Sequence, residues 1–163
     1  MPIREIRLFG DPVLKTACDP VVIGDPRLAD LVQDLTDTTT PPGRAGVAAN
    51  QIGVGLRAFS YHIDGTVGYL LNPVLVEVSG DPEPVEEGCL SVPGLWMPTP
   101  RHPFARARGF DLEGNEVEIS GTGVMAQAIQ HELDHLDGML YLDRLDRDTR
   151  KEAMRQIRES SWF

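Results

Sequence analysis

Residues 130–138 read QHELDHLDG and contain two of the four histidines of the chain. On a helix, the i and i+4 positions of His131 and His135 put both imidazoles on one face, where two ring nitrogens can reach one metal ion. Glu132 can contact a metal-bound water there without being a ligand. This HExxH pattern is typical of zinc hydrolases. It predicts a metal site on a helix from about residue 122 to 137, with Gly138 as its C-cap.

The segments around this helix predict an α+β fold with a mainly antiparallel sheet. A first helix is expected after Asp25 as its cap, with an apolar stripe that ends before residues 38–43. Another is expected over 146–159. The prolines between residues 81 and 103 predict a loop or an extended path. Two hairpins supply the strands, which are expected at 56–63 and 67–78, and at 104–112 and 116–119.

The composition is that of one globular domain covering residues 1–163, with 41% hydrophobic and 25% charged residues. The chain contains no apolar run of the roughly 18 residues that a membrane span needs, and no apolar core of a secretion signal follows the N-terminus. A cytoplasmic location is therefore expected. The net charge of −10 disfavours DNA and anionic membranes as partners. With two cysteines, a disulfide framework is not expected.

Two histidines leave a metal under-coordinated, so a third ligand must come from another segment. The metzincin pattern HExxHxxGxxH fails because Tyr141 stands in place of the third histidine. A gluzincin-type protease would take Glu152 or Glu159 from a later helix. Cys89 offers a thiolate, which suits Zn²⁺ and Fe²⁺, although most free cysteines are small buried apolar groups. A non-enzymatic module would close its site with a fourth ligand, for which the candidates are His62, His102 and Cys18.

Three segments taken together resemble the signature motifs of peptide deformylases. Residues 46–51 (GVAANQ), 87–91 (EGCLS) and 130–135 (QHELDH) follow the family patterns GxGxAAxQ, EGCxS and QHExDH in order and spacing. The resemblance spans nearly the whole chain and implies a sheet wrapped around the central HExxH helix, with an N-terminal and a C-terminal helix. One position departs from the pattern: Arg44 replaces the first glycine, which affects the expected shape of that loop and its substrate preference.

The resemblance implies a metal-dependent hydrolase that removes the formyl group from N-formylmethionine on nascent polypeptides and releases formate. Cys89, His131 and His135 would bind one divalent metal ion, Fe²⁺ in the native enzyme with Zn²⁺ or Ni²⁺ as substitutes. Glu132 would act as general base. The donors to the oxyanion would be the Gln51 amide and the backbone N–H of Leu90.

The resemblance also implies how the substrate binds. The formyl peptide would lie extended beside the backbone of Gly46 and Gly88, as an added strand. Gln127 is unusual in such a pocket, where an apolar residue is expected. The methionine pocket would be lined by Ala45, Val124, Gln127 and Ala128.

Two further expectations concern charged residues. Glu87 and Arg101 are candidates for supporting a metal ligand, and a surface ion pair is the alternative. The helix from Arg147 carries five basic and three acidic residues, and our hypothesis is that it docks weakly on the ribosome, as the family resemblance implies. A solvated helix face with i,i+4 ion pairs is the more common arrangement for such a sequence.

Overall fold

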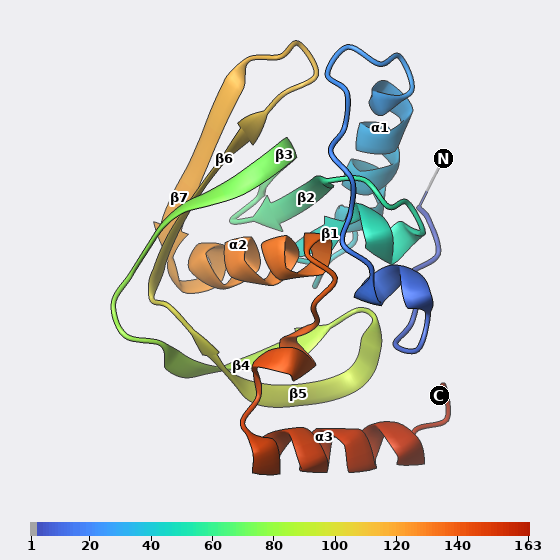
Figure 1. Cartoon of the computed structure of the whole chain (residues 1–163), viewed down its shortest axis with the longest axis vertical. Helices are drawn as coiled ribbons and strands as arrows, with labels where there is room; N and C mark the ends of the chain where they lie inside the picture. Colours follow the sequence, from blue (N-terminus) through green and yellow to red (C-terminus); the bar gives the residue numbers. More distant parts are fainter. Residues whose placement is uncertain (1–2) are drawn as a thin grey trace.

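The computed structural model describes residues 3–163. Within them the chain forms two antiparallel sheets, three α-helices and three short 3₁₀ turns (Figure 1). None of these helices has the length and apolar composition that crossing a bilayer requires. The helices are α1 (Leu28–Thr39), α2 (Gly123–Leu136) and α3 (Arg147–Glu159). The strands are β1 (Gly46–Ala48), β2 (Ala58–Ile63), β3 (Thr66–Ser79), β4 (Glu83–Cys89), β5 (Val92–Arg101), β6 (Phe104–Phe110) and β7 (Glu116–Thr122).

The larger sheet has the strand order β1-β2-β3-β6-β7, and each neighbouring pair is antiparallel. Its two predicted hairpins are present, with strand ends within three residues of the expected ones. The turn between β2 and β3 places Asp64 and Gly65 at φ values of 52° and 79°. Two successive positive φ values are those of a type I′ turn, which matches the twist of a hairpin. The α+β fold with a mainly antiparallel sheet is confirmed.

Helix α2 lies between the larger sheet and a second sheet made of β4 and β5, with α3 on the far side of that ribbon (Figure 1). Ile129 and Leu133 of α2 pack against Phe59 and Leu70 of the larger sheet. This apolar face fixes the rotation of the helix. Residues on the remaining faces, including His131, are therefore directed away from that sheet and toward the ribbon.

The ribbon decides between the two paths expected for the proline-rich region: most of it is extended and forms the strands β4 and β5, rather than a loop. From Leu95 to its end at Arg101, β5 alternates buried and exposed residues, and its buried side chains include Leu95 and Met97. They pack on Ala153 and Ile157 of α3. Proline is tolerated because both strands of a two-stranded sheet are edge strands, so a missing N–H breaks few ladder bonds. Because every second side chain from Leu95 onward is buried, with Leu95 and Met97 against α3, this region forms a strand despite its prolines.

The helix ends differ slightly from the predicted ones. α1 begins at Leu28 with Arg27 as N-cap, because the Asp25 carboxylate accepts a hydrogen bond from the Arg27 N–H and closes a turn before the helix. The apolar stripe of α1 is buried as expected. α3 begins as predicted, since the Asp146 side chain accepts from the Thr149 N–H at 2.8 Å.

Candidate metal centre

Three donor atoms from two distant segments converge beside α2. His131 and His135 lie on successive turns of α2, and Cys89 ends β4. Cys89 Sγ is 3.3 Å from His135 Nε2, which is 3.2 Å from His131 Nε2, and all three donors lie within 4.8 Å of one another. Around a tetrahedral zinc-sized ion, nitrogen and sulfur ligands lie about 3.3–3.6 Å apart. The spacing therefore fits one small divalent ion.

The pKa values of the two histidines are shifted in opposite directions. Burial alone would lower the pKa of His131, but its interactions with Cys89 and Glu87 outweigh burial and raise it well above the usual range. For His135, burial and the neighbouring charge of His131 lower the pKa well below the usual range. His135 is thus a neutral imidazole in a fully buried position, which is the state that binds a metal.

A buried chain of ion pairs orients His131. Its Nδ1 lies 2.6 Å from Glu87 Oε2, and Arg101 donates two hydrogen bonds to the same carboxylate, at 2.9 and 2.6 Å. Arg101 and Arg144 both donate to Asp134, at 2.8 Å each. Burial would raise the pKa of Glu87, but the hydrogen bonds from Arg101 and His131 lower it to about 2.

This arrangement decides between the two interpretations of the Glu87–Arg101 pair. The two side chains are only 2% and 4% exposed, so the surface ion pair is wrong. A carboxylate fixed on Nδ1 holds the ring and leaves Nε2 free for a metal. Sequence reasoning missed the roles of Asp134 and Arg144. Asp134 could have been found, because it occupies a specified position of the QHExDH pattern.

Glu132 lies buried against the backbone of β1. Its Oε1 has no hydrogen-bond partner among the described residues. A Cβ atom at Gly46 would come within 2.6 Å of Oε2, so the missing side chain at residue 46 makes room for the carboxylate. Burial raises the pKa of Glu132 to about 7. A carboxylate of this kind can exchange a proton near neutral pH.

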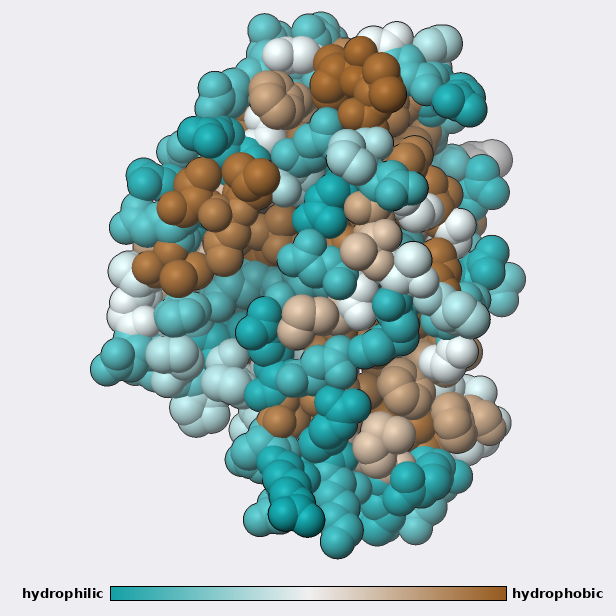
Figure 2. Space-filling view, in the orientation of Figure 1, coloured by the Kyte–Doolittle hydropathy of each residue, from teal (hydrophilic) through white to brown (hydrophobic). Residues whose placement is uncertain are grey.

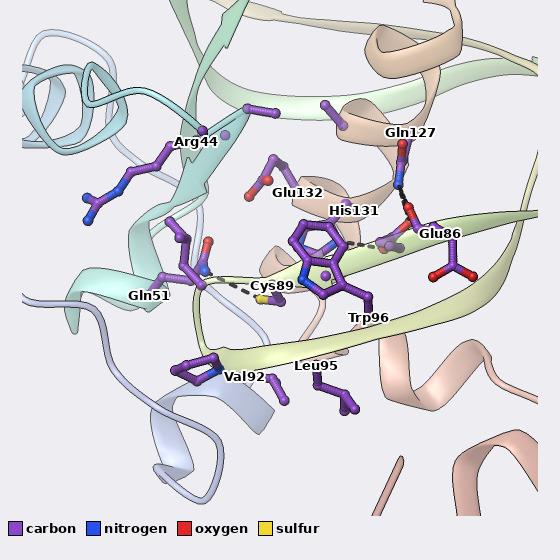
Figure 3. Close-up of a pocket in the computed structure, with 18 of the residues that line it drawn as sticks. Arg44, Gln51, Glu86, Cys89, Val92, Leu95, Trp96, Gln127, His131 and Glu132 are labelled. Carbon is purple, nitrogen blue, oxygen red and sulfur yellow. Dashed lines mark hydrogen bonds and ion pairs between the residues drawn. The ribbon is translucent and has the colours of Figure 1, made fainter. Parts of the chain in front are cut away.

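Gln51 points its amide nitrogen at the metal ligands. It lies in the 3₁₀ turn Ala49–Ile52 and is 1% exposed. Its Oε1 accepts from the Ala48 N–H at 2.9 Å, while Nε2 lies 3.7 Å from Cys89 Sγ and 3.2 Å from the Ser91 hydroxyl (Figure 3). The backbone contact fixes which end of the amide faces the site. Gln51 is therefore not an ordinary loop amide.

One cleft of about 460 Å³ opens onto these residues. The structure brings together in its lining Glu132, Gln51, Leu90 and two of the predicted ligands, Cys89 and His131. Sequence reasoning missed the part of the lining that β5 and the turn before it supply, including Trp96, because the ribbon was not expected. All six predicted substrate-binding residues also line it, namely Ala45, Gly46, Gly88, Val124, Gln127 and Ala128.

The two unusual residues of the cleft are accommodated. Arg44 directs its guanidinium away from the cleft and donates to the Thr38 carbonyl at 2.8 Å (Figure 3). Its φ is not positive, so the backbone there does not require the glycine of the family pattern. Gln127 donates its amide to the Glu86 carbonyl at 3.2 Å and to Glu87 Oε1 at 3.4 Å. Its polar end is thus bound to β4.

The alternative ligands do not reach the site. Glu152 and Glu159 are exposed on α3, and both bind Arg155. Among residues 3–163, the cluster of potential metal donors consists of Cys89, His131 and His135 alone. The gluzincin arrangement is therefore wrong, and so is a closed site with a fourth histidine or cysteine ligand.

A helix-borne histidine pair, a thiol, a buried carboxylate and an amide donor at the inner end of a cleft define a metal-dependent hydrolase site. Comparison with known proteins agrees with this class. The model of the polypeptide deformylase family matches residues 3–151. The chain therefore belongs to the peptide deformylase family, metalloenzymes that remove the formyl group from N-formylmethionine peptides.

Individual relatives are similar over most of their length. The chain is 49% identical to a peptide deformylase of Acidothermus cellulolyticus, covering 99% of this chain and 89% of the relative. It is 46% identical to peptide deformylase 1 of Corynebacterium glutamicum, covering 100% and 99%. The crystal structure of the Legionella pneumophila enzyme superimposes with a TM-score of 0.89 at 35% identity, covering 97% and 95% of the two chains. The predicted family and activity are confirmed.

Proposed function

We propose that this chain hydrolyses the formyl amide of N-formylmethionyl peptides with Cys89, His131 and His135 as metal ligands and Glu132 as general base. The observation that carries the assignment is the convergence of three donor atoms beside a buried carboxylate with an unpaired oxygen. Three protein ligands leave one position open on a tetrahedral ion, as at catalytic rather than structural sites. The bound metal would supply a Lewis acid that makes a water molecule acidic at neutral pH.

The chain's own residues then move the proton and stabilise charge. Glu132, with a pKa of about 7, accepts the proton of the attacking water and passes it to the leaving amine. The Gln51 amide and the Leu90 N–H would donate to the oxyanion that forms on the formyl oxygen. The Ala48 N–H holds Gln51 in place beforehand, so no reorganisation is needed during the reaction. The products are formate and a peptide with a free N-terminal methionine.

The substrate would lie extended in the cleft between the backbone of Gly46 and that of Gly88. Both glycines line the cleft. The methionine side chain would pack among Ala45, Val124, Gln127 and Ala128. Because the Gln127 amide is bound to β4, its methylene groups are free to pack against the substrate.

The thiolate ligand bears on the choice of metal. One anionic ligand lowers the formal charge of the site from +2 to +1, and the sulfur makes the site oxidisable. We propose Fe²⁺ as the native ion, with Zn²⁺ or Ni²⁺ as substitutes, and the cytoplasm, where nascent chains emerge, as the location. Metal analysis of enzyme purified anaerobically tests the ion, and zinc alone in such a sample would refute the iron assignment.

We also propose that α3 docks weakly on the ribosome. Its outer surface is hydrophilic in Figure 2, and it carries exposed basic residues. Arg155 is partly neutralised by its ion pairs with Glu152 and Glu159, which is why the docking is weak. Reversing the charges of Arg155 and Arg158 should reduce co-sedimentation with ribosomes. Unchanged co-sedimentation would refute the docking.

The decisive experiment is an anaerobic assay with formyl-Met-Ala-Ser, scoring formate release and metal content in the same sample. Glu132→Gln should lower kcat by about 10²–10⁴-fold with its metal retained. Cys89→Ser should lose metal and activity together. Glu152→Ala and Glu159→Ala are matched controls that should keep both. A Glu132→Gln variant as active as the parent enzyme would contradict the assignment of the base.

A further inference from the structure

Trp96 is an exposed aromatic residue at the rim of the cleft. Its neighbours Leu95 and Met97 are 4% and 6% exposed because they pack against the α3 side of the ribbon, whereas Trp96 is 65% exposed. Alternation along β5 turns it to the opposite face, where it lines the cleft mouth near Cys89 and His131 (Figure 3). Such an exposed ring beside an active site is a candidate binding surface.

The ring lies directly against the backbone of β4. A Cβ atom at Gly88 would come within 2.7 Å of the indole Cε3, so only a residue without a side chain allows this contact. Gly88 precedes the ligand Cys89. A peptide that pairs with the backbone of Gly88 must therefore run alongside the indole ring.

We propose that Trp96 binds the side chain of the residue that follows methionine and favours a large apolar or aromatic group there. This inference rests on the proposed function of the cleft. Successive side chains of an extended peptide point to opposite sides, about 3.3–3.6 Å apart along the chain. With methionine packed against the α2 wall, the next side chain points toward the opposite wall, where Trp96 stands.

The charge of the rim adds a second selectivity. The exposed Glu86 lies in the same lining, and its carboxylate repels an acidic residue at this position of the peptide. The expected order of preference for the residue after methionine is therefore phenylalanine, then alanine, then aspartate.

Kinetics with formyl-Met-Phe-Ser, formyl-Met-Ala-Ser and formyl-Met-Asp-Ser test this on the metal-loaded enzyme. Burying the phenyl ring should raise kcat/KM about tenfold over alanine, through KM. Trp96→Ala should bring the phenylalanine-to-alanine ratio of kcat/KM close to one, while its kcat for the alanine peptide stays within about twofold of that of the parent enzyme. Trp96→Phe should retain most of the tenfold preference. Trp162→Phe is the matched control, because that indole donates to the Pro93 carbonyl and does not line the cleft.

Fluorescence gives a readout that does not require turnover. The chain has two tryptophans, so a Trp162→Phe, Glu132→Gln variant reports on Trp96 alone. Its emission should shift on adding formyl-Met-Phe-Ser, and about tenfold more of the alanine peptide should be needed for half the change.

The outcomes separate the two proposals. A phenylalanine-to-alanine ratio that is near one in the parent enzyme, or unchanged in Trp96→Ala, would overturn the role of Trp96 while formate release still supports the proposed function. An equal loss of kcat/KM for all three peptides in Trp96→Ala would also overturn it, since Trp96 would then only maintain the shape of the cleft. Absence of formate with every peptide would instead refute the proposed function.

Discussion

At the scale of single residues, the position of Glu132 depends on the missing side chain of Gly46. Gly46→Ala would place a Cβ atom 2.6 Å from Glu132 Oε2, so the carboxylate must move. A shift of about 1 Å in a catalytic group can lower the rate about 10²-fold, and we expect kcat to fall by this amount. The measurement is steady-state formate release with the melting temperature recorded in parallel.

Gly55→Ala provides the comparison for that variant. Nothing lies within 4 Å of a Cβ atom at Gly55, and its φ is not positive. Its kcat should match that of the parent enzyme. If Gly46→Ala is equally active, the carboxylate does not need its present position.

The two cysteines should differ sharply in reactivity. Cys18 is 6% exposed, and burial raises its pKa to about 11, whereas Cys89 lines the cleft. A thiol reagent at pH 8 should modify neither cysteine in the metal-loaded enzyme and Cys89 alone after chelation. Mass spectrometry identifies the modified residue, and Cys89→Ser should remain unmodified. Labelling of Cys18 before unfolding would contradict its buried state.

The raised pKa of Cys18 predicts that the free energy of unfolding falls at alkaline pH. Its pKa in the folded protein lies above the ordinary value of 9.0, so the unfolded chain loses the thiol proton first as pH rises. The buried, protonated thiol of Cys18 therefore contributes its full stabilisation of the folded state below pH 9, and this contribution is lost as pH approaches about 11. Denaturant titrations across this range measure it, and Cys18→Ala should show a weaker decline.

Local spacing explains which residues could be predicted from the sequence. The histidine pair and Glu132 follow from helical periodicity within five residues. The Asp134–Arg101 contact joins residues 33 positions apart, and it depends on how β5 packs beside α2. The orientation of Trp96 likewise depends on the ribbon. No periodic pattern encodes such contacts, because they arise only once the elements are packed together.

At the scale of elements, the ribbon of β4 and β5 was the part of the fold for which sequence patterns could not decide between a loop and an extended path. Proline normally argues against a strand, and this region carries several. An isolated two-stranded sheet is marginally stable, so its existence depends on a partner that lies about 50 residues later in the sequence. That partner is α3, whose buried residues Ala153 and Ile157 pack on β5.

This dependence predicts the effect of Ile157→Ala. The side chain is 1% exposed beneath the ribbon, so its truncation leaves a cavity. We expect the free energy of unfolding to fall by about 2–4 kcal/mol, measured by chemical denaturation. The exposed neighbour Arg158→Ala should change it by less than about 0.5 kcal/mol. A stability loss as small as that of the control would mean that α3 does not support the ribbon.

At the scale of the whole molecule, the candidate metal site joins two separate apolar cores. α2 belongs to the core beneath the larger sheet, through Ile129 and Leu133. Cys89 instead packs against the core shared by the ribbon and α3. An ion bound to Cys89, His131 and His135 would therefore cross-link the two parts of the fold, in addition to serving catalysis.

Metal removal should consequently destabilise the entire chain. A ligand present at 100 times its Kd stabilises the folded state by about 2.7 kcal/mol, which corresponds to about 5–10 °C in Tm for a protein of this size. Calorimetry with and without a chelator measures the difference, with metal content determined on both samples. Cys89→Ala should show a much smaller shift on chelation, because the cross-link is already broken. An unchanged Tm in enzyme shown to have lost its metal would exclude the cross-link, since the two cores would then be held together by side-chain packing alone.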